Sequence, residues 1–331
     1  MLDAAFSGYP DHGHDMKSLY PEIPPLSSTL LEADGGHRIY VEESGNKNGI
    51  PVIFLHGGPG SGCNENHRRY FNPELYRIVI FDQRGCNRSS PAGETQNNTT
   101  RDLLNDMELI RDKLGIAKWL VYGGSWGATL GLLYAQQYPQ RVLAMVLRGT
   151  FLARQSDLDW FIREGLNRIF PDAWSDFISV VPVPERGDLI DAFYRRMHGS
   201  DDEEKKRFAS AWSIWTGRTV TYLFSATENY EIHAVEKAVH EVSIETHYAR
   251  HRYFIEEDQI IKNINKLPDV PIRIIHGRRD LTCLLEASWT LHQHIKKSEL
   301  IIVREGGHLA GEAVMTDALV QATDHMAGLL S

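Results

Sequence analysis

The chain has 331 residues, of which 42% are hydrophobic and 24% charged, and its formal net charge is −9. These proportions are ordinary for a globular protein, and the length suits one large domain with an insertion or two domains. The acidic balance argues against a nucleic-acid partner, three cysteines are too few for a disulfide framework, and no apolar run approaches the length that spans a membrane.

The N-terminus lacks the basic start and the sustained apolar core of a secretory signal, so we expect a cytoplasmic protein. Residues 1 to about 27 are rich in proline, glycine and histidine, and they predict an arm laid over the surface. Continuous apolar runs at 52–55 and 77–82 then predict strands that are buried on both faces.

A helix is predicted to begin after Thr99 or Thr100, which can cap it, and to end near Gly115. A short strand at 118–122, a buried helix at 128–135 and another strand at 141–148 follow. Because strands alternate with helices, we expect a mostly parallel sheet covered by helices.

The pattern changes at about residue 151, and up to about 260 amphipathic helical stretches with many aromatic residues replace the strands. Strand patterns return at 272–277 and 300–303, and a last helix runs through 313–330. We therefore expect an α/β core built from residues 1–150 and 261–331, with residues 151–260 inserted as a helical cap.

The turn after the strand at 118–122 carries the most specific motif. Residues 123–127 read Gly-Gly-Ser-Trp-Gly and match G-x-S-x-G. A serine on a sharp strand-to-helix turn projects its hydroxyl as a nucleophile, and flanking glycines avoid collisions at so tight a bend. Ser125 is therefore the candidate nucleophile.

A serine hydroxyl needs a base, and the base needs a third group that fixes its tautomer. Where a G-x-S-x-G serine acts, an acid and then a histidine follow it along the chain. Asp280 follows the strand at 272–277, and His308 follows the strand at 300–303. Considered alone, Asp280 is explained as a loop carboxylate paired with a neighbouring arginine. His308 alone is explained as an exposed histidine without a catalytic role, one of 15 in the chain. Their joint order and setting favour a catalytic triad.

A glycine-rich loop follows the strand at 52–55. Residues 56–60 read His-Gly-Gly-Pro-Gly, which is typical of the loops that hold an oxyanion in esterases, although a plain turn is the alternative. We expect the Gly58 and Trp126 amides to bind the oxyanion. No phosphate-loop or metal-binding motif is found in the sequence, so neither a metal nor a cofactor is expected.

Four motifs in this order resemble those of the prolyl aminopeptidases, also called proline iminopeptidases. They are His-Gly-Gly-Pro-Gly at 56–60, Asp-Gln-Arg-Gly-Cys at 82–86, Gly-Gly-Ser-Trp-Gly at 123–127 and His-Gly-Arg-Arg-Asp at 276–280. The resemblance covers nearly the whole chain. It implies an α/β-hydrolase fold with a mostly parallel central sheet and an inserted helical cap. It also implies an enzyme that removes N-terminal proline from peptides.

The resemblance also implies roles for single residues. Ser125, Asp280 and His308 match the family's triad, and Gly58 and Trp126 match its oxyanion hole. Phe151 matches a residue that packs on the proline ring. Cys283 matches a cysteine near the catalytic acid and is expected either to line the pocket or to be a small buried residue.

The chain departs from the family in the cap. Glu245 matches one of two glutamates that bind the substrate's amine, but Thr216 stands where the other is usual. Ala249 stands where the family has an aromatic residue, and Asn87, which tolerates a left-handed backbone, stands where it has glycine. Loss of one carboxylate is expected to weaken recognition of a protonated imine by about tenfold to a hundredfold.

These departures leave three functions open. The first is a prolyl aminopeptidase acting on small peptides. In that case Glu241, Glu256 or Glu257 either replaces the carboxylate missing at Thr216 or belongs to an ordinary solvated helix face. The second is a carboxylesterase or broad amidase with an altered cap, acting on small amides or esters. The third is a hydrolase fold used only for binding. The sequence leaves the oligomeric state open.

Overall fold

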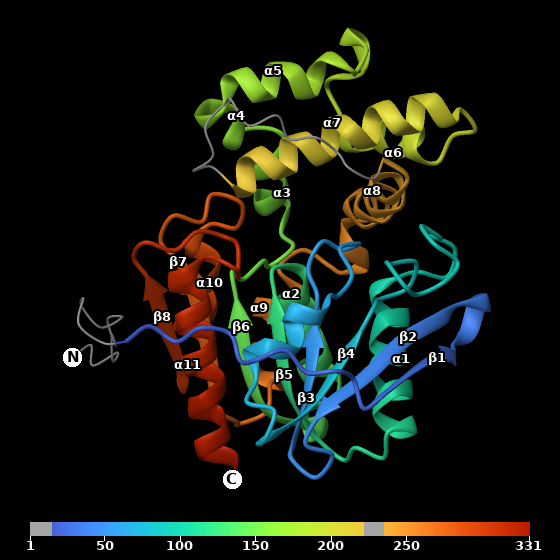
Figure 1. Ribbon diagram of the computed structural model, residues 1–331. Helices are drawn as coiled ribbons and strands as arrows, with labels where there is room; N and C mark the ends of the chain where they lie inside the picture. Colours follow the sequence, from blue (N-terminus) through green and yellow to red (C-terminus); the bar gives the residue numbers. More distant parts are fainter. Residues whose placement is uncertain (1–14, 222–234) are drawn as a thin grey trace.

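A single sheet runs through the computed structural model, which describes residues 15–221 and 235–331 (Figure 1). Its eight strands lie in the order β1-β2-β4-β3-β5-β6-β7-β8. They are β1 (Ser27–Glu32), β2 (Arg38–Gly45), β3 (Ile50–Leu55), β4 (Tyr76–Phe81), β5 (Trp119–Gly124), β6 (Val142–Arg148), β7 (Ile272–Gly277) and β8 (Ser298–Val303). Residues 1–14 of the predicted arm lie outside the described residues.

The pairing of the strands is parallel from β4 to β8, whereas β1 pairs with β2, and β2 with β4, in antiparallel fashion. Every residue of β5 is buried, because helices cover both faces of the sheet there. This confirms the predicted α/β class with a mostly parallel sheet. The two antiparallel pairings at one edge were not predicted.

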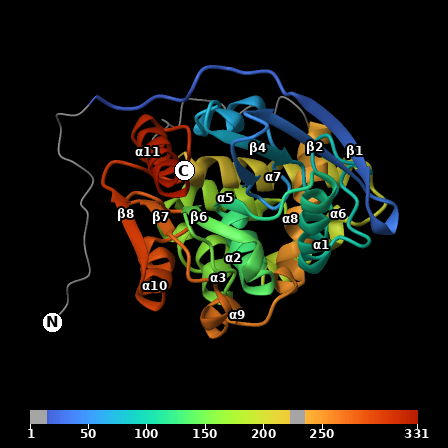
Figure 2. The same cartoon turned by 90° about the horizontal axis from the view of Figure 1, so that it is seen from below.

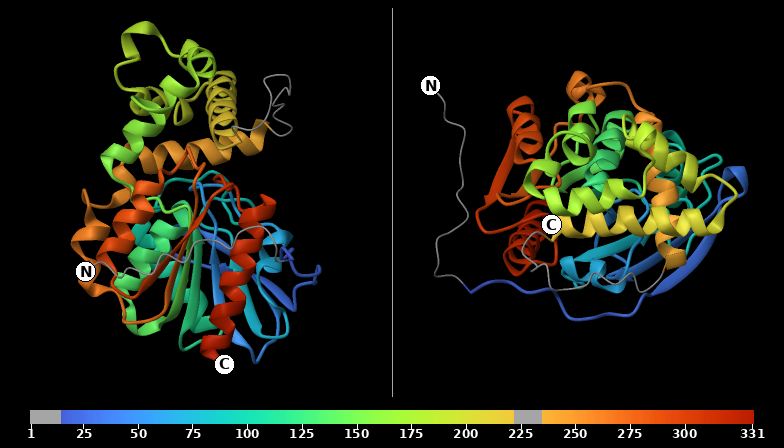
Figure 3. Two further views of the ribbon diagram at one scale, coloured as in Figure 1. Left: turned by 90° about the vertical axis from the view of Figure 1, so that its left-hand side faces the viewer. Right: turned by 90° about the horizontal axis from the view of Figure 1, so that it is seen from above.

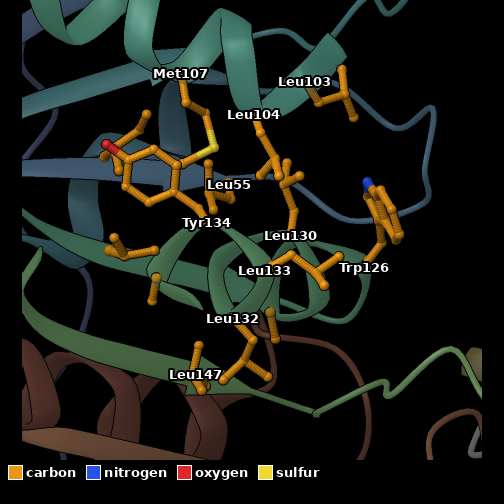
Figure 4. Close-up of a cluster of buried hydrophobic side chains, with 14 of the residues drawn as sticks. Leu55, Leu103, Leu104, Met107, Trp126, Leu130, Leu132, Leu133, Tyr134 and Leu147 are labelled. Carbon is orange, nitrogen blue, oxygen red and sulfur yellow. The ribbon is translucent and has the colours of Figure 1, made fainter. Parts of the chain in front are cut away.

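Four helices pack against the two faces of the sheet (Figures 2 and 3). They are α1 (Thr100–Lys113), α2 (Trp126–Gln137), α10 (Leu285–His294) and α11 (Ala313–Leu330). Side chains of α1, α2 and α10 share one hydrophobic cluster, part of which Figure 4 shows, while α11 contributes to the cluster on the opposite face. Thr99 caps α1, as predicted from the sequence, and it also forms a capping box with Asp102.

Helices follow one another in the described residues between β6 and β7. They are α3 (Gln155–Ile162), α4 (Leu166–Ile169), α5 (Pro171–Ser179), α6 (Leu189–Met197), α7 (Asp202–Val220), α8 (Val235–Arg250) and α9 (Gln259–Lys262). Of these, α3 to α8 lie over the end of the sheet where β3, β5, β6 and β7 terminate (Figures 1 and 3). A third hydrophobic cluster, which includes Phe177, Phe193, Phe208, Trp212 and Trp215, joins α5, α6 and α7.

Short 3-10 turns complete the elements of the described chain. They are η1 (Asp34–Gly36), η2 (Glu65–Tyr70), η3 (Pro139–Arg141), η4 (Val183–Glu185), η5 (Arg252–Phe254) and η6 (Ile264–Lys266). None of the helices in the described segments combines the length and the apolar character needed to cross a membrane. Tyr222, one of the aromatic residues of the predicted cap, lies outside the described residues.

Candidate active site

Ser125 lies on the turn between β5 and α2 with φ 56° and ψ −123°, which is a left-handed backbone for a residue with a side chain. Its amide donates a hydrogen bond of 2.9 Å to the Arg148 carbonyl at the end of β6. A Cβ on Gly127 would lie 2.0 Å from the Leu55 carbonyl oxygen, so only glycine fits there. The Gly-Gly-Ser-Trp-Gly motif thus folds as the sharp strand-to-helix turn that was predicted.

Asp280 and His308 meet in the loops that follow β7 and β8. The Asp280 Oδ2 atom accepts a hydrogen bond of 2.7 Å from His308 Nδ1. Its other oxygen accepts from the backbone amides of Thr282 and Cys283 at 3.0 and 2.9 Å. Burial opposes ionisation of Asp280, but the nearby His308 ring and its hydrogen bond outweigh that effect and lower the pKa of the carboxyl. The pair therefore holds an ionised carboxylate against Nδ1 of the histidine, so that Nε2 is the ring nitrogen not bonded to Asp280.

The Ser125 hydroxyl and the His308 ring open into the same cavity. Among the described residues, the hydrogen bond found for Ser125 Oγ goes to Cys283 Sγ, 3.9 Å away, and His308 Nε2 lies 3.4 Å from Arg148 Nη1. The serine and the histidine thus line one cavity, and no direct hydrogen bond between them is found in the described residues. Such bonds are often long before substrate binds and shorten in the complex.

The loop after β3 lies against Ser125. A Cβ on Gly57 would lie 3.4 Å from the Ser125 Cβ, and Gly58 has φ 108°, a conformation that glycine alone adopts easily. Trp126 is the first residue of α2, so its amide has no partner within the helix. Gly57 thus lies against Ser125, and Trp126 follows the serine at the start of α2, while binding of an oxyanion by the Gly58 and Trp126 amides stays a prediction.

Gln83 connects these two elements, a role that was not predicted although its motif was recognised. Its side-chain amide donates to the His56 carbonyl at 3.0 Å, and its oxygen accepts from the Trp126 indole at 2.9 Å. The Gln83 backbone amide also donates to His56 Nε2 at 3.0 Å. Gln83 thus fixes the glycine-rich loop relative to α2.

The shared cavity has a volume of about 860 Å³ and lies between the sheet and the overlying helices. All four predicted substrate-binding residues line it: Phe151, Thr216, Glu245 and Cys283. So do Ser125, Gly58 and His308 from the predicted catalytic set. The fold therefore brings distant parts of the sequence to one place.

Glu245 is the buried acid of the cavity. Its carboxylate accepts a hydrogen bond from the Trp212 indole, which connects α8 to α7. Burial raises the pKa of Glu245 to about 8, with Trp212 opposing this rise and Glu241 adding to it. An acid in this state readily accepts a cationic partner, since the partner's charge would restore its ionised form.

Aromatic rings line the cavity beside Ala249. The Phe151 ring lies 5.0 Å from the Tyr253 ring, edge to face, and Tyr253 lies 5.4 Å from Trp126. Tyr253 sits in η5, where Arg252, Tyr253 and Phe254 all have positive φ. Tyr253 therefore supplies an aromatic wall next to Ala249, and no periodicity in the sequence had marked this residue.

Among residues 15–221 and 235–331, no second carboxylate is found beside Thr216. The Thr216 Oγ1 atom is buried, with no hydrogen-bond partner in the described part of the chain. Glu241, Glu256 and Glu257 do not line the cavity. Asp157 does, but it forms an ion pair of 2.8 Å with Arg154.

The described residues contain no group of three or more His, Cys, Asp or Glu side chains arranged to hold a metal ion. All three cysteines are free and buried. Cys283 is a cavity residue, whereas Cys63 and Cys86 pack in the hydrophobic clusters of the sheet.

Comparison with known proteins shows the family. A family model described as the alpha/beta hydrolase fold matches residues 50–312. The proline iminopeptidase of Xylella fastidiosa is 45% identical over 314 residues, which cover 93% of this chain and 99% of the relative. The proline iminopeptidase of Xanthomonas citri is 44% identical over 314 residues, covering 94% and 100%.

Solved structures support the fold at much lower identity. A hydrolase from Pseudomonas aeruginosa superposes with a TM-score of 0.65 and is 16% identical in sequence. The match covers 92% of this chain and 99% of that hydrolase. At that identity the likeness concerns the fold alone. The resemblance drawn from the four sequence motifs is confirmed by the relatives.

Proposed function

The chain belongs to the proline iminopeptidase family of α/β-hydrolases, and on that premise we propose that it releases N-terminal proline from small peptides through an acyl-enzyme on Ser125. One observation carries the proposal. The buried pair of Asp280 and His308, joined at 2.7 Å, faces a cavity that also holds Ser125 and the buried acid Glu245.

In the proposed reaction, Ser125 Oγ attacks the carbonyl carbon of the proline residue while His308 Nε2 takes the hydroxyl proton. Asp280 accepts from Nδ1, which fixes the tautomer that leaves Nε2 free as a base and stabilises the imidazolium that forms. The Gly58 and Trp126 amides stabilise the oxyanion. His308 then gives its proton to the departing amine, and a water molecule hydrolyses the prolyl ester by the same steps.

Recognition of the acyl group is assigned to the cap side of the cavity. Glu245 binds the protonated imine of proline, and the rings of Phe151 and Tyr253 enclose the pyrrolidine. Cys283 fills the space beside the nucleophile, 3.9 Å from Ser125 Oγ. Thr216 adds a neutral wall, with no second acid beside it in the part of the chain that the structure describes.

We also propose the division of the chain that the sequence suggested. Residues 1–150 and 261–331 form the catalytic core, and residues 151–260 form the cap that carries the acyl pocket. We propose that the protein acts in the cytoplasm on small substrates, which agrees with its three free cysteines. Its net charge of −9 agrees with the absence of a nucleic-acid partner from this proposal.

Thr216 and Ala249 favour a second candidate, a carboxylesterase or broad amidase. Both residues line the 860 Å³ cavity, which exceeds what one proline ring fills. The test compares kcat/KM for a proline arylamide, other aminoacyl arylamides and short-chain p-nitrophenyl esters, with Ser125→Ala as the control. Strong preference for the proline arylamide supports the peptidase, whereas good ester turnover with negligible proline release supports the esterase.

A fluorophosphonate probe separates both enzymes from a protein that only binds. The proposal expects rapid labelling of Ser125 in the wild type and none in Ser125→Ala. A wild-type protein that resists the probe contradicts any serine hydrolase.

A further inference from the structure

Arg148 occupies the core side of the cavity, at the end of β6. Its guanidinium packs so closely on Gly124 that a Cβ there would lie 2.3 Å from Nη2. Nη1 donates to the His308 carbonyl at 2.8 Å and lies 3.4 Å from His308 Nε2. A fixed positive charge therefore stands beside the atom that delivers the proton to the departing amine.

This charge has no carboxylate within salt-bridge distance in the described segments of the chain. The acids that line the cavity are engaged elsewhere: Asp157 pairs with Arg154, and Glu312 accepts from the Gly307 and Leu309 amides. Glu245 is bound to Trp212 on the cap side. Arginine can donate five hydrogen bonds, yet those found for Arg148 use Nη1 alone. In the described residues no hydrogen-bond partner is found for the N–H groups of Nη2 and Nε, which lie against Gly124.

The residues around Arg148 supply no competing positive charge. Burial, with help from His56 and Arg148, lowers the pKa of His67 to about 4, so that this neighbouring ring is neutral. Asn64 and Asn66 also line the cavity, with neutral amides. Arg148 is thus the one Lys or Arg side chain among the described residues that line the cavity.

On the basis of the proposed function, we propose that Arg148 binds the free α-carboxylate of the departing amino acid, and that the preferred substrates are therefore dipeptides with N-terminal proline. The scissile nitrogen must approach His308 Nε2 to receive its proton. In a dipeptide the carboxyl carbon lies only about 2.5 Å from that nitrogen, across two covalent bonds. A guanidinium 3.4 Å from Nε2 is well placed to reach such a carboxylate, and its fork matches the carboxylate geometry.

The polar groups of the cavity complement such a dipeptide. Glu245, Arg148 and Ser125 all line it, so that Glu245 takes the substrate's cationic amine and Arg148 its carboxylate while Ser125 attacks the carbonyl. In a longer peptide or an amide, a neutral carbonyl replaces the carboxylate next to Arg148. The neutral carbonyl accepts a weaker hydrogen bond from Arg148, because the bond is no longer between two charged groups.

The test measures kcat/KM for prolylglycine and prolylglycinamide, which differ only in the carboxylate, beside a proline arylamide. We expect the wild type to prefer prolylglycine by about tenfold or more. In Arg148→Met this ratio should fall to about one, even if loss of the His308 contact slows both substrates. Arg278→Met removes an exposed positive charge that does not line the cavity, and it should keep the wild-type ratio.

Arg148→Lys keeps the charge without the fork and is expected to show an intermediate ratio, which provides a measurement if the methionine variant does not fold. A wild-type ratio near one, with normal turnover of the arylamide, overturns the role of Arg148 and leaves the proposed function standing. A preference for prolylglycine over prolylglycinamide that persists in Arg148→Met also overturns the role of Arg148. Absence of proline release from all three substrates contradicts the proposed function itself.

Discussion

Glu245 illustrates how one buried side chain can be costly to the fold and useful to the site. The carboxyl has little access to water, and a single indole donor is its hydrogen-bond partner in the described residues. The neutral acid is therefore favoured until a cation arrives. A protonated imine provides that cation, so substrate binding and ionisation of Glu245 should be coupled.

The raised pKa predicts a pH dependence of stability. The folded protein keeps the Glu245 proton up to about pH 8, whereas the unfolded chain loses it near 4.5, so this residue makes unfolding easier as pH rises between those values. Glu245→Gln should therefore match the wild type near about pH 5 and be more stable near about pH 8. Urea unfolding at the two pH values measures the difference.

Glu236→Gln, an exposed change on the same helix, is the matched control and should show no such trend. Equal stability of Glu245→Gln and the wild type at both pH values would contradict the assignment. In activity, Glu245→Gln should lose turnover of prolyl substrates far more than turnover of neutral esters.

Gln83 predicts a separate effect on catalysis. Gln83→Leu leaves the His56 carbonyl and the Trp126 indole without their partner, which should cost about 1–3 kcal/mol of stability for each group. Because the two oxyanion donors are no longer held together, kcat should fall about tenfold to a hundredfold. KM should change little, since Gln83 does not line the cavity.

Steady-state kinetics on a proline arylamide would check this, with the exposed Gln137→Leu on α2 as the control. A rise in KM at constant kcat would argue that Gln83 acts on substrate binding instead.

At the scale of elements, α8 is tied to the core by one asparagine. The Asn98 oxygen accepts from Tyr248 at 2.9 Å, and its side-chain nitrogen donates to the Arg84 and Glu94 carbonyls at 3.1 and 2.9 Å. The Asn98 backbone carbonyl also bonds to His247 Nε2 at 2.9 Å. These contacts fix the helix that carries Glu245.

Asn98→Ala should therefore lower stability by about 2–4 kcal/mol and raise KM for prolyl substrates, because α8 would no longer hold Glu245 in register. Tyr248→Phe removes only one of these bonds and should cost about 0.5–1.5 kcal/mol. Denaturant unfolding and KM values test both variants. An unchanged KM in Asn98→Ala would mean that the cap helices hold Glu245 without help from the core.

Prediction from the sequence worked best where a local rule decides the outcome. The capping of α1 by Thr99 and the glycines around Ser125 follow from backbone chemistry, and Asn87 does adopt a left-handed backbone, with φ 46°. Arg148 and Tyr253 were not predicted as site residues. Their positions depend on strands and turns far apart in the chain, and neither residue belongs to a motif with a local rule.

At the scale of the whole molecule, the cavity is lined by residues of the loops that follow the strands and of the overlying helices. The aromatic cluster packs α5 to α7 together, and two clusters flank the sheet. Helix α8 belongs to both regions, since Val242 packs in the aromatic cluster and Tyr248 in a cluster of the sheet. Alternating strands and helices predicted the sheet, and the aromatic segment predicted the helices over it. That Glu245 and Arg148 line one cavity depends on how these regions pack, which no single segment determines.

The most direct test of the central claim is to capture the acyl-enzyme. The protein is mixed with a prolyl p-nitrophenyl ester, quenched in acid within the turnover time, and examined by intact and peptide mass spectrometry. We expect a mass gain of one prolyl group on the peptide that contains Ser125, and none in a folded Ser125→Ala variant. Proline release by the wild type with the adduct on another residue, or with Ser125→Ala fully active, would contradict the central claim.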